Sequence, residues 1–205
     1  MQRPGKIICV GRNYFDHAAE LGNTVPAEPL IFLKPPSAVI GPDESIVLPD
    51  VSQRVEHEGE IGLVVGHGLC KVAEGDALQG IAGVTCVNDV TARDLQRSDD
   101  QWTRAKGFDT FCPVGPRVVP LQDVASIDGL EVICRVNGAE RQRGRVSQMA
   151  FGLARIVSYI SQIMTLEEGD LIVTGTPAGV GPLEPGDAVE VEIPGVGVLR
   201  NPVVR

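Results

Sequence analysis

Residues 55–65 (VEHEGEIGLVV) limit the possible folds of this chain more than any other stretch. Side chains of a β-strand point alternately to opposite faces of the sheet. One face of this segment is mostly apolar and can be buried, whereas the opposite face begins with Glu56, Glu58 and Glu60 in a row. Three like charges along one face repel each other unless a cation lies among them. We therefore expect a strand over residues 55–65 whose acidic face either meets solvent or holds positive charge.

A solvated acidic face is the usual explanation of a Glu-x-Glu pattern, and spacing alone leaves it open. Two details favour a metal site. The acidic row runs into apolar residues 62–65, so its inner end points toward the core, and Gly59 and Gly62 are typical of close approach by a ligand or another backbone. Mg²⁺ prefers carboxylate oxygens, and no group of His or Cys residues has zinc-site spacing. Asp89 ends another apolar run, where an unpaired acid would be costly, and is a candidate third ligand.

Short strands and turns account for most of the remaining chain. The 24 glycines, 15 prolines and only 4% aromatic residues favour a β-rich domain over a helical bundle. Asn137-Gly138 predicts a hairpin between residues 130–136 and 140–143. Further strands are expected over residues 6–10, 30–33, 45–48, 81–90, 170–173, 188–193 and 197–201. The pattern predicts a mostly β domain with some α, packed as a sandwich or roll.

Helical periodicity is clearest between Met149 and Ile163, where apolar residues recur at helical spacing and Ser147 is the expected N-cap. A shorter helix is predicted to begin at Asn13 and end near Leu21. Brief helical stretches are expected near residues 74–78 and from residue 92 onward.

Composition excludes several classes of function. A length of 205 residues fits one domain, and a net charge of −9 argues against nucleic-acid or anionic-membrane partners, which require a basic surface. No segment approaches a membrane span, and the N-terminal apolar run is too short for a signal peptide. The five cysteines are odd in number and show no CxxC spacing, so we expect buried free thiols and a cytoplasmic protein. No dinucleotide or P-loop motif occurs.

The predicted first helix carries a candidate acid–base pair. His17 and Glu20 are spaced i, i+3, so their side chains can meet on one face, and a histidine beside a carboxylate suits general-base catalysis. An exposed polar helix face explains the spacing equally well. Lys106 lies in an aromatic stretch that is less typical of surface charge. Backbone N–H groups of the glycine-rich residues 174–181 are candidates for holding a carboxylate.

Six short motifs carry a resemblance to a known family. They are residues 11–14 (GRNY), 32–35 (FLKP), 57–60 (HEGE), 88–94 (NDVTARD), 106–111 (KGFDTF) and 174–181 (TGTPAGVG). Their order and their extent, from residue 11 to residue 181, resemble the fumarylacetoacetate hydrolase family. Among its members the chain is most similar to short bacterial acylpyruvases, such as fumarylpyruvate hydrolase, that lack an extra N-terminal domain.

The resemblance implies a mixed β-sandwich roll formed by residues 1–205 as a single catalytic domain of the family's C-terminal type, and a homodimer. It also implies Mg²⁺ or Mn²⁺ held by Glu58, Glu60 and Asp89. Glu56 departs from the residue type expected at its position, and we expect it to face solvent.

The same resemblance implies a small 2-oxo acid substrate and a lid helix near residues 13–21 that closes over it. In the hydrolases of the family a His–Glu pair activates water, and this role would fall to His17 and Glu20. Lys106 would act beside them in catalysis. The implied substrate contacts are Arg12, Arg93, Gln96 and Thr176.

The implied reaction is hydrolysis of a C–C bond in an acylpyruvate, such as fumarylpyruvate or acetylpyruvate. The metal stabilises the pyruvate enolate, and Lys106 and Arg93 add positive charge where negative charge develops. The family also contains oxaloacetate decarboxylases and isomerases of aromatic catabolism. Those isomerases act on 2-hydroxyhepta-2,4-diene-1,7-dioate or 5-carboxymethyl-2-hydroxymuconate. Both alternatives use the same enolate and stay open.

Overall fold

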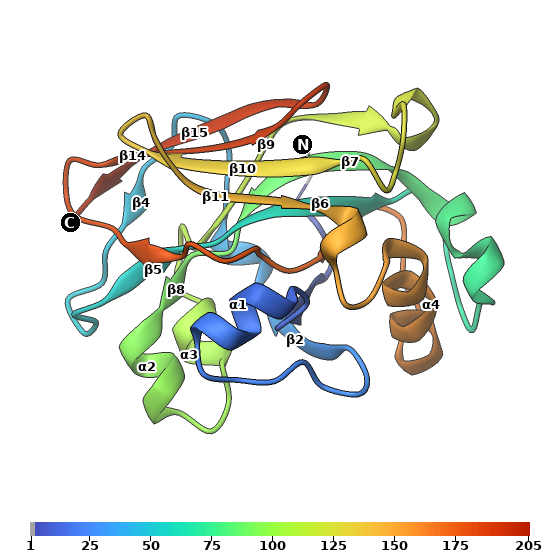
Figure 1. Ribbon diagram of the computed structural model, residues 1–205, viewed down its shortest axis with the longest axis horizontal. Helices are drawn as coiled ribbons and strands as arrows, with labels where there is room; N and C mark the ends of the chain where they lie inside the picture. The colour runs from blue at the N-terminus through green and yellow to red at the C-terminus, as the bar shows by residue number, and fades with distance from the viewer. Residues whose placement is uncertain (1–2) are drawn as a thin grey trace.

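Strands dominate the computed structural model, which describes residues 3–205 (Figure 1). A seven-stranded sheet has the order β2 (Leu30–Lys34), β1 (Ile7–Gly11), β12 (Leu171–Val173), β6 (Gly59–Val65), β7 (Ile81–Asn88), β9 (Cys112–Pro120) and β3 (Val39–Ile40). A five-stranded sheet has the order β11 (Ala139–Arg145), β10 (Glu131–Val136), β14 (Ala188–Ile193), β15 (Gly197–Val204) and β4 (Ile46–Val47). A small sheet joins β13 (Gly181–Pro182), β5 (Val55–His57) and β8 (Thr91–Ala92).

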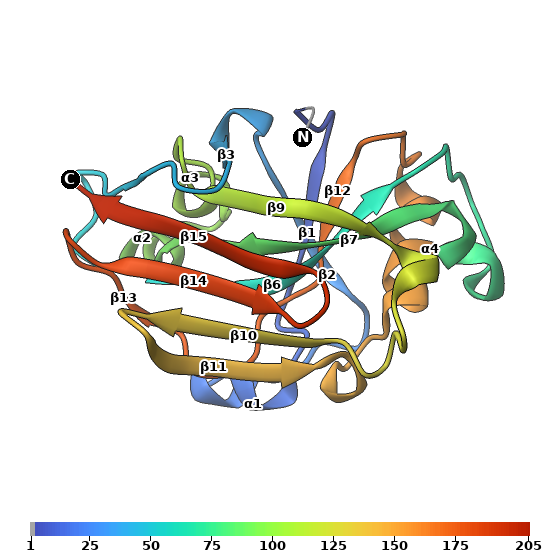
Figure 2. The same ribbon diagram turned by 90° about the horizontal axis from the view of Figure 1, so that it is seen from above.

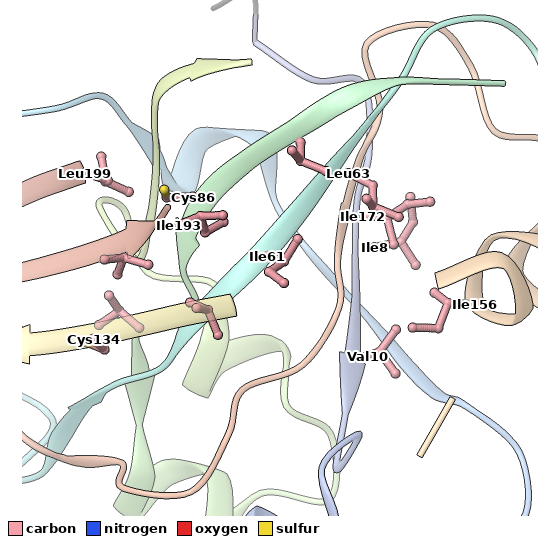
Figure 3. Close-up of a cluster of buried hydrophobic side chains, with 14 of the residues drawn as sticks. Ile8, Val10, Ile61, Leu63, Cys86, Cys134, Ile156, Ile172, Ile193 and Leu199 are labelled. Atoms are coloured by element: carbon pink, nitrogen blue, oxygen red, sulfur yellow. The ribbon is translucent and has the colours of Figure 1, made fainter. Parts of the chain in front are cut away.

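The two large sheets form two layers with an apolar core between them (Figures 1 and 2). Figure 3 shows Ile61 and Cys86 of the larger sheet on the side that faces Cys134, Ile193 and Leu199 of the smaller one. All five side chains are buried in one continuous cluster. The predicted fold class, a mostly β mixed roll with few helices, is confirmed.

Helix α4 (Leu153–Ile163) packs against the same face of the larger sheet, where Ile156 contacts the cluster beside Ile8 and Ile172 (Figure 3). The prediction that Ser147 caps this helix is wrong. The N-cap is Gly152, and Ser147 lies in a 3₁₀ turn (Val146–Gln148). The intervening chain is extended because Met149 bridges to Tyr14 and the Ala150 N–H donates to the Asn13 carbonyl.

Three short helices, α1 (Phe15–Glu20), α2 (Arg93–Ser98) and α3 (Thr103–Lys106), lie below the strands in the view of Figure 1. Asn13 does not cap α1 as predicted, since its amide side chain bonds to Phe151 and to the Thr174 carbonyl instead. The remaining helical segments are 3₁₀ turns at Pro36–Ala38, Glu74–Gly80 and Leu121–Asp123. Within residues 3–205, no helix combines the length and apolar character that a membrane crossing requires.

The prediction of one continuous strand over residues 55–65 is wrong in one respect. The structure divides this segment into two strands, β5 and β6, which belong to different sheets. Glu58 occupies the corner between them. Its N–H donates to Oδ1 of Asn88 at 3.0 Å, and its carbonyl accepts the N–H of Asp89 at 2.8 Å. The close approach predicted at Gly59 is confirmed, since a Cβ atom there would lie 2.9 Å from Cβ of Cys134 in the other sheet.

The predicted hairpin is confirmed between β10 and β11, with Asn137 (φ 53°) and Gly138 (φ 77°) both in the left-handed conformation that a tight turn requires. All five cysteines are free thiols. Cys70 is exposed, contrary to the expectation of burial, and the other four are buried.

Candidate active site

A cavity of about 260 Å³ opens where α1, α2 and α3 meet the end of the larger sheet. Ten residues were predicted to form the site, and all of them except Glu20 line this cavity. The predicted metal ligands, which are Glu58, Glu60 and Asp89, are among them. The fold therefore brings together residues that are far apart in the sequence.

Glu58, Glu60 and Asp89 form a buried cluster in which one carboxylate oxygen from each lies within 4.8 Å of the others. Glu58 comes from the corner between β5 and β6, Glu60 from β6, and Asp89 from the residue after β7. Neighbouring strand ends thus direct three hard oxygen donors at one point, which is the donor type that Mg²⁺ and Mn²⁺ prefer.

Glu60 gives the clearest sign that the cluster suits a cation. Its carboxylate accepts the N–H of Gly175, and no Lys, Arg or His within residues 3–205 forms an ion pair with it. Burial, together with the nearby charges of Asp89 and Glu58, raises the pKa of Glu60 well above its usual value. A divalent cation would remove this penalty, so the three residues fit the metal that the resemblance implies.

Two buried lysines flank the carboxylates. Nζ of Lys106 lies 2.7 Å from Oε2 of Glu58 and 2.6 Å from Oδ2 of Asp89. Nζ of Lys34 lies 2.5 Å from Oδ1 of Asp89. Burial opposes the charge on Lys106, but Asp89 and Glu58 outweigh it and raise the pKa of the lysine. Lys34 was not predicted as a site residue. A lysine at the end of an apolar strand was the one feature of the sequence that could have indicated its burial in the site.

Arg93 links two glutamates behind the cavity. Its Nε donates to Oε2 of Glu56 at 2.7 Å, a second nitrogen donates to Oε1 of Glu58 at 2.5 Å, and a third donates to Gln96. The expectation that Glu56 faces solvent is wrong, because it is 2% exposed and also accepts a bond from Arg54. Burial opposes ionisation of Glu56, but the two arginines outweigh it and lower its pKa.

The His17–Glu20 pair lies at the rim of the cavity on α1. His17 is buried, and its Nδ1 lies 3.5 Å from Oε2 of Glu20, which is longer than a good hydrogen bond. Burial is the main cause that lowers the pKa of His17. The imidazole therefore favours its neutral form, which can accept a proton. Both oxygens of Glu20 accept the N–H of Gly179 at 3.1 Å and join α1 to the loop over residues 174–181.

Gln142 of β11 supports the same loop and was not predicted as a site residue. Its Nε2 donates to Oγ1 of Thr176 and to the Pro177 carbonyl, both at 2.7 Å. Its Oε1 accepts the N–H of Gly59 at 2.9 Å and lies 3.1 Å from Nδ1 of the buried His57. Gln142 is one polar residue in a hairpin strand that also carries several charges, so the sequence does not indicate that its side chain points inward.

Comparison with known proteins agrees with this arrangement. The profile described as fumarylacetoacetate (FAA) hydrolase C-terminal matches residues 6–204. The chain belongs to the fumarylacetoacetate hydrolase family. This family assignment confirms the resemblance that the sequence motifs indicated.

Solved structures and curated proteins of the family show what the chain is similar to. A 2-hydroxyhepta-2,4-diene-1,7-dioate isomerase from Mycobacterium marinum is 50% identical, with a TM-score of 0.90 over 99% of this chain and 75% of that one. Fumarylpyruvate hydrolase from Pseudomonas aeruginosa, in complex with Mn²⁺ and pyruvate, is 32% identical, with a TM-score of 0.92 over 98% of this chain and 90% of that one. Human mitochondrial oxaloacetate tautomerase is 44% identical over 211 residues, which cover 98% of this chain and 67% of the relative.

These members of the fumarylacetoacetate hydrolase family are named as a hydrolase, an isomerase and a tautomerase. All three names describe enzymes. The Pseudomonas hydrolase structure contains Mn²⁺, and in this chain Glu58, Glu60 and Asp89 form a carboxylate cluster whose spacing could hold a metal ion.

Proposed function

We propose that this protein is a metal-dependent enzyme that hydrolyses a C–C bond of acylpyruvates, releasing pyruvate and a carboxylic acid. The observation that carries the proposal is the cluster of Glu58, Glu60 and Asp89, with the Lys106 ammonium, at the floor of a small cavity. Glu58, Glu60 and Asp89 would hold Mg²⁺ or Mn²⁺, which supplies Lewis-acid stabilisation of a 2-oxo acid enolate.

Side chains around the floor would stabilise the negative charge that develops. In hydrolysis, water adds to the acyl carbon and gives up a proton to a base, and the C3–C4 bond breaks. The electron pair of this bond moves to C3, and the pyruvate enolate then takes up a proton at C3 to give pyruvate. The Lys106 ammonium lies at the floor where this charge develops, and Arg93 and Gln96 line the adjacent wall. Thr176 and the backbone N–H groups of its loop would orient the substrate carboxylate.

His17 would act as the general base. It is buried at the rim of the cavity and kept neutral, so it can take a proton from the attacking water. Glu20 lies near enough to stabilise the imidazolium that results. Because Glu20 also accepts the N–H of Gly179, α1, the proposed lid, keeps His17 beside the loop over residues 174–181.

A second candidate is proton transfer on an enol, as in the isomerase and tautomerase relatives. The higher identities to those relatives, 50% and 44% against 32% for the hydrolase, favour it. Oxaloacetate decarboxylation would need the same enolate stabilisation and no attacking water. In isomerisation or tautomerisation His17 would transfer a proton to or from carbon rather than activate water, whereas decarboxylation would not depend on it.

We also propose that the protein acts as a single-domain homodimer in the cytoplasm. The proposal rests on the family resemblance for the dimer and on composition for the compartment. In the monomer, β2 is an edge strand of the large sheet with Leu33 49% exposed, which offers apolar surface for association. Light scattering should give twice the mass of one chain, and a mass equal to one chain would contradict the dimer.

A product-resolved assay tests the proposed reaction. The Mn²⁺-loaded protein is incubated with acetylpyruvate, fumarylpyruvate, oxaloacetate and a hydroxymuconate-type substrate, and products are followed by NMR. Release of pyruvate from an acylpyruvate is the expected result. Isomerised or decarboxylated products without pyruvate release from any acylpyruvate would contradict hydrolysis and support the second candidate.

A further inference from the structure

A buried glutamine connects the backbone of the carboxylate cluster to the glycine-rich loop over residues 174–181. Gln142, on β11, is 1% exposed. Its Oε1 accepts the N–H of Gly59, the residue between two of the candidate metal ligands, at 2.9 Å. Its Nε2 donates to Oγ1 of Thr176 and to the carbonyl of Pro177, both at 2.7 Å. One side chain therefore bonds to two separate parts of the candidate site.

The partners of Gln142 allow only one orientation of its amide group. The N–H of Gly59 can only donate and the carbonyl of Pro177 can only accept, so Oε1 must face the first and Nε2 the second. Oε1 also lies 3.1 Å from Nδ1 of the buried His57. Each N–H of the amide and each lone pair of its oxygen thus has a partner, and a rotation of the amide would lose several bonds at once.

The glycine-rich loop packs directly on the backbone of β11. A Cβ atom at Gly179, whose φ is 102°, would lie 1.9 Å from the carbonyl oxygen of Arg141. A Cβ atom at Gly144 would lie 2.6 Å from Cβ of Pro177. Both glycines permit this close approach, so the position of the loop depends on β11 and on the Gln142 side chain that β11 directs inward.

The bonds of Thr176 show which of its groups is available to a ligand. Its hydroxyl accepts from Gln142 and donates to the Gly59 carbonyl at 2.9 Å, so the one hydroxyl proton is engaged. Its backbone N–H has no acceptor among residues 3–205, although Thr176 is only 2% exposed and lines the cavity. Buried N–H groups are seldom left unpaired. The N–H of Thr176 is therefore a donor for an oxygen atom of a bound ligand.

We propose that Gln142 is a positioning residue for the substrate, which acts through Thr176 from outside the cavity. The inference rests on the proposed function, because the ligand is the 2-oxo acid of that reaction. By fixing the hydroxyl of Thr176, Gln142 holds the N–H of the same residue at the cavity wall. Its bond to Gly59 fixes the distance of this donor from the carboxylate cluster, so that both can act on one small ligand.

Equilibrium binding of pyruvate, the 2-oxo acid that the proposed reaction releases, tests this role. Gln142→Met removes the hydrogen bonds of the amide with little change in size. Calorimetry, first with Mn²⁺ and then with pyruvate, gives each dissociation constant and the fraction of chains that bind. Pyruvate binding should weaken about tenfold or more. The Mn²⁺ dissociation constant should change less than about threefold, because Gln142 bonds to none of the three carboxylates.

Two further variants separate the contacts of Gln142. Thr176→Val removes the hydroxyl and keeps the side-chain shape, and it should also weaken pyruvate binding. Because Gln142 acts through Thr176, the double variant should bind pyruvate within about threefold of the weaker single variant. Gln142→Glu keeps an acceptor for Gly59 and removes the donors to the loop, so it should weaken pyruvate binding even if Gln142→Met does not fold.

Arg141→Gln is the matched control. Arg141 is the preceding residue on β11 and is exposed on the opposite face of the strand. This variant should bind Mn²⁺ and pyruvate as the wild type does.

Unchanged pyruvate affinity in both Gln142 variants would overturn the proposal, as would effects that multiply in the double variant. Equal loss of Mn²⁺ and pyruvate affinity would also overturn it, because Gln142 would then act on the metal ligands. A merely structural role would lower Tm and the fraction of binding chains but leave the pyruvate dissociation constant unchanged. Failure of the proposed function is a separate result. A protein whose pyruvate binding depends on Gln142, but which cleaves no acylpyruvate, keeps the positioning role and loses the hydrolase assignment.

Discussion

The ammonium of Lys106 lies 2.6 Å from Oδ2 of Asp89, and both side chains are almost completely buried. The same nitrogen lies 2.7 Å from Glu58, so one lysine holds two of the three candidate metal ligands. We therefore propose two functions for Lys106. It compensates buried negative charge in the folded protein, and it places positive charge where an enolate would form.

Replacing Lys106 with Met should destabilise the protein most strongly when no metal is bound. Removing one partner of a buried ion pair costs about 3–5 kcal/mol, which for a chain of this size lowers Tm on the order of 10 °C. Saturating Mn²⁺ should restore part of this loss, because the cation compensates the carboxylates that the lysine no longer neutralises. Thermal unfolding with chelator and with Mn²⁺ measures both effects.

Arg104→Gln is the matched control for this experiment. Arg104 is on the same short helix but pairs with Asp99 at the surface, where solvent screening leaves an ion pair little effect on stability. A similar loss of Tm in both variants, or no metal dependence for Lys106→Met, would contradict the role assigned to Lys106.

Replacing Glu56 with Gln should weaken substrate binding, because Glu56 orients the Arg93 guanidinium in the wall of the cavity. The amide keeps the shape of the carboxylate but removes the charge that orients the guanidinium, so we expect KM to rise about tenfold with a smaller change in kcat. Steady-state kinetics on an acylpyruvate measure the split. The control is Arg54→Gln, which removes the other ion-pair partner of Glu56. The Arg54 side chain is 51% exposed, so this variant should have little effect on KM or kcat. Equal effects of the two variants would refute the positioning role.

His17→Ala should lower acylpyruvate cleavage by about 10²–10⁴-fold while sparing much of any oxaloacetate decarboxylation. The reason is that only hydrolysis needs a base to activate water. Product formation from each substrate is measured on the same preparation. His67→Ala, at an exposed loop position, is the control. Equal loss of both activities in His17→Ala would argue against water activation.

The imidazole of His17 should titrate below the usual histidine pKa of 6.5 in the metal-free protein, because burial disfavours its charged form. The same difference in pKa between folded and unfolded protein makes the stability depend on pH. Below pH 6.5 the unfolded chain takes up the proton more readily than the folded one, so this contribution to stability is present above that pH and is lost as the pH falls. NMR titration of the ring, assigned with His17→Ala, gives the midpoint, and a midpoint above 6.5 would contradict the prediction.

Much of the fold and of the site could be predicted because these parts depend on patterns among residues that are close together in the sequence. The alternation over residues 55–65, the Asn137-Gly138 turn and the apolar run before Asp89 each depend on neighbouring residues only. The sequence motifs then supplied nine of the sixteen residues that line the cavity. Glu58, Glu60 and Asp89, which the resemblance groups as metal ligands, lie within 4.8 Å of one another in the structure.

What could not be predicted depends on contacts between distant segments. The break at Glu58 exists because Asn88 and Asp89 bond to its backbone, and the burial of Glu56 depends on Arg93 of another element. Asn13 has the sequence character of a helix cap, yet its side chain bonds to a segment about 140–160 residues away. Lys34 pairs with Asp89 across 55 residues. No local pattern reports such pairings.

Metal binding by the carboxylate cluster is the central claim, and Mn²⁺ titration by calorimetry tests it most directly. We expect one Mn²⁺ per chain for the wild type and at least about 100-fold weaker binding for Glu60→Gln, which removes a buried candidate ligand that forms no ion pair within residues 3–205. Activity should disappear on chelation and return with Mg²⁺ or Mn²⁺. Unchanged binding in Glu60→Gln, or full turnover after exhaustive chelation, would contradict the account.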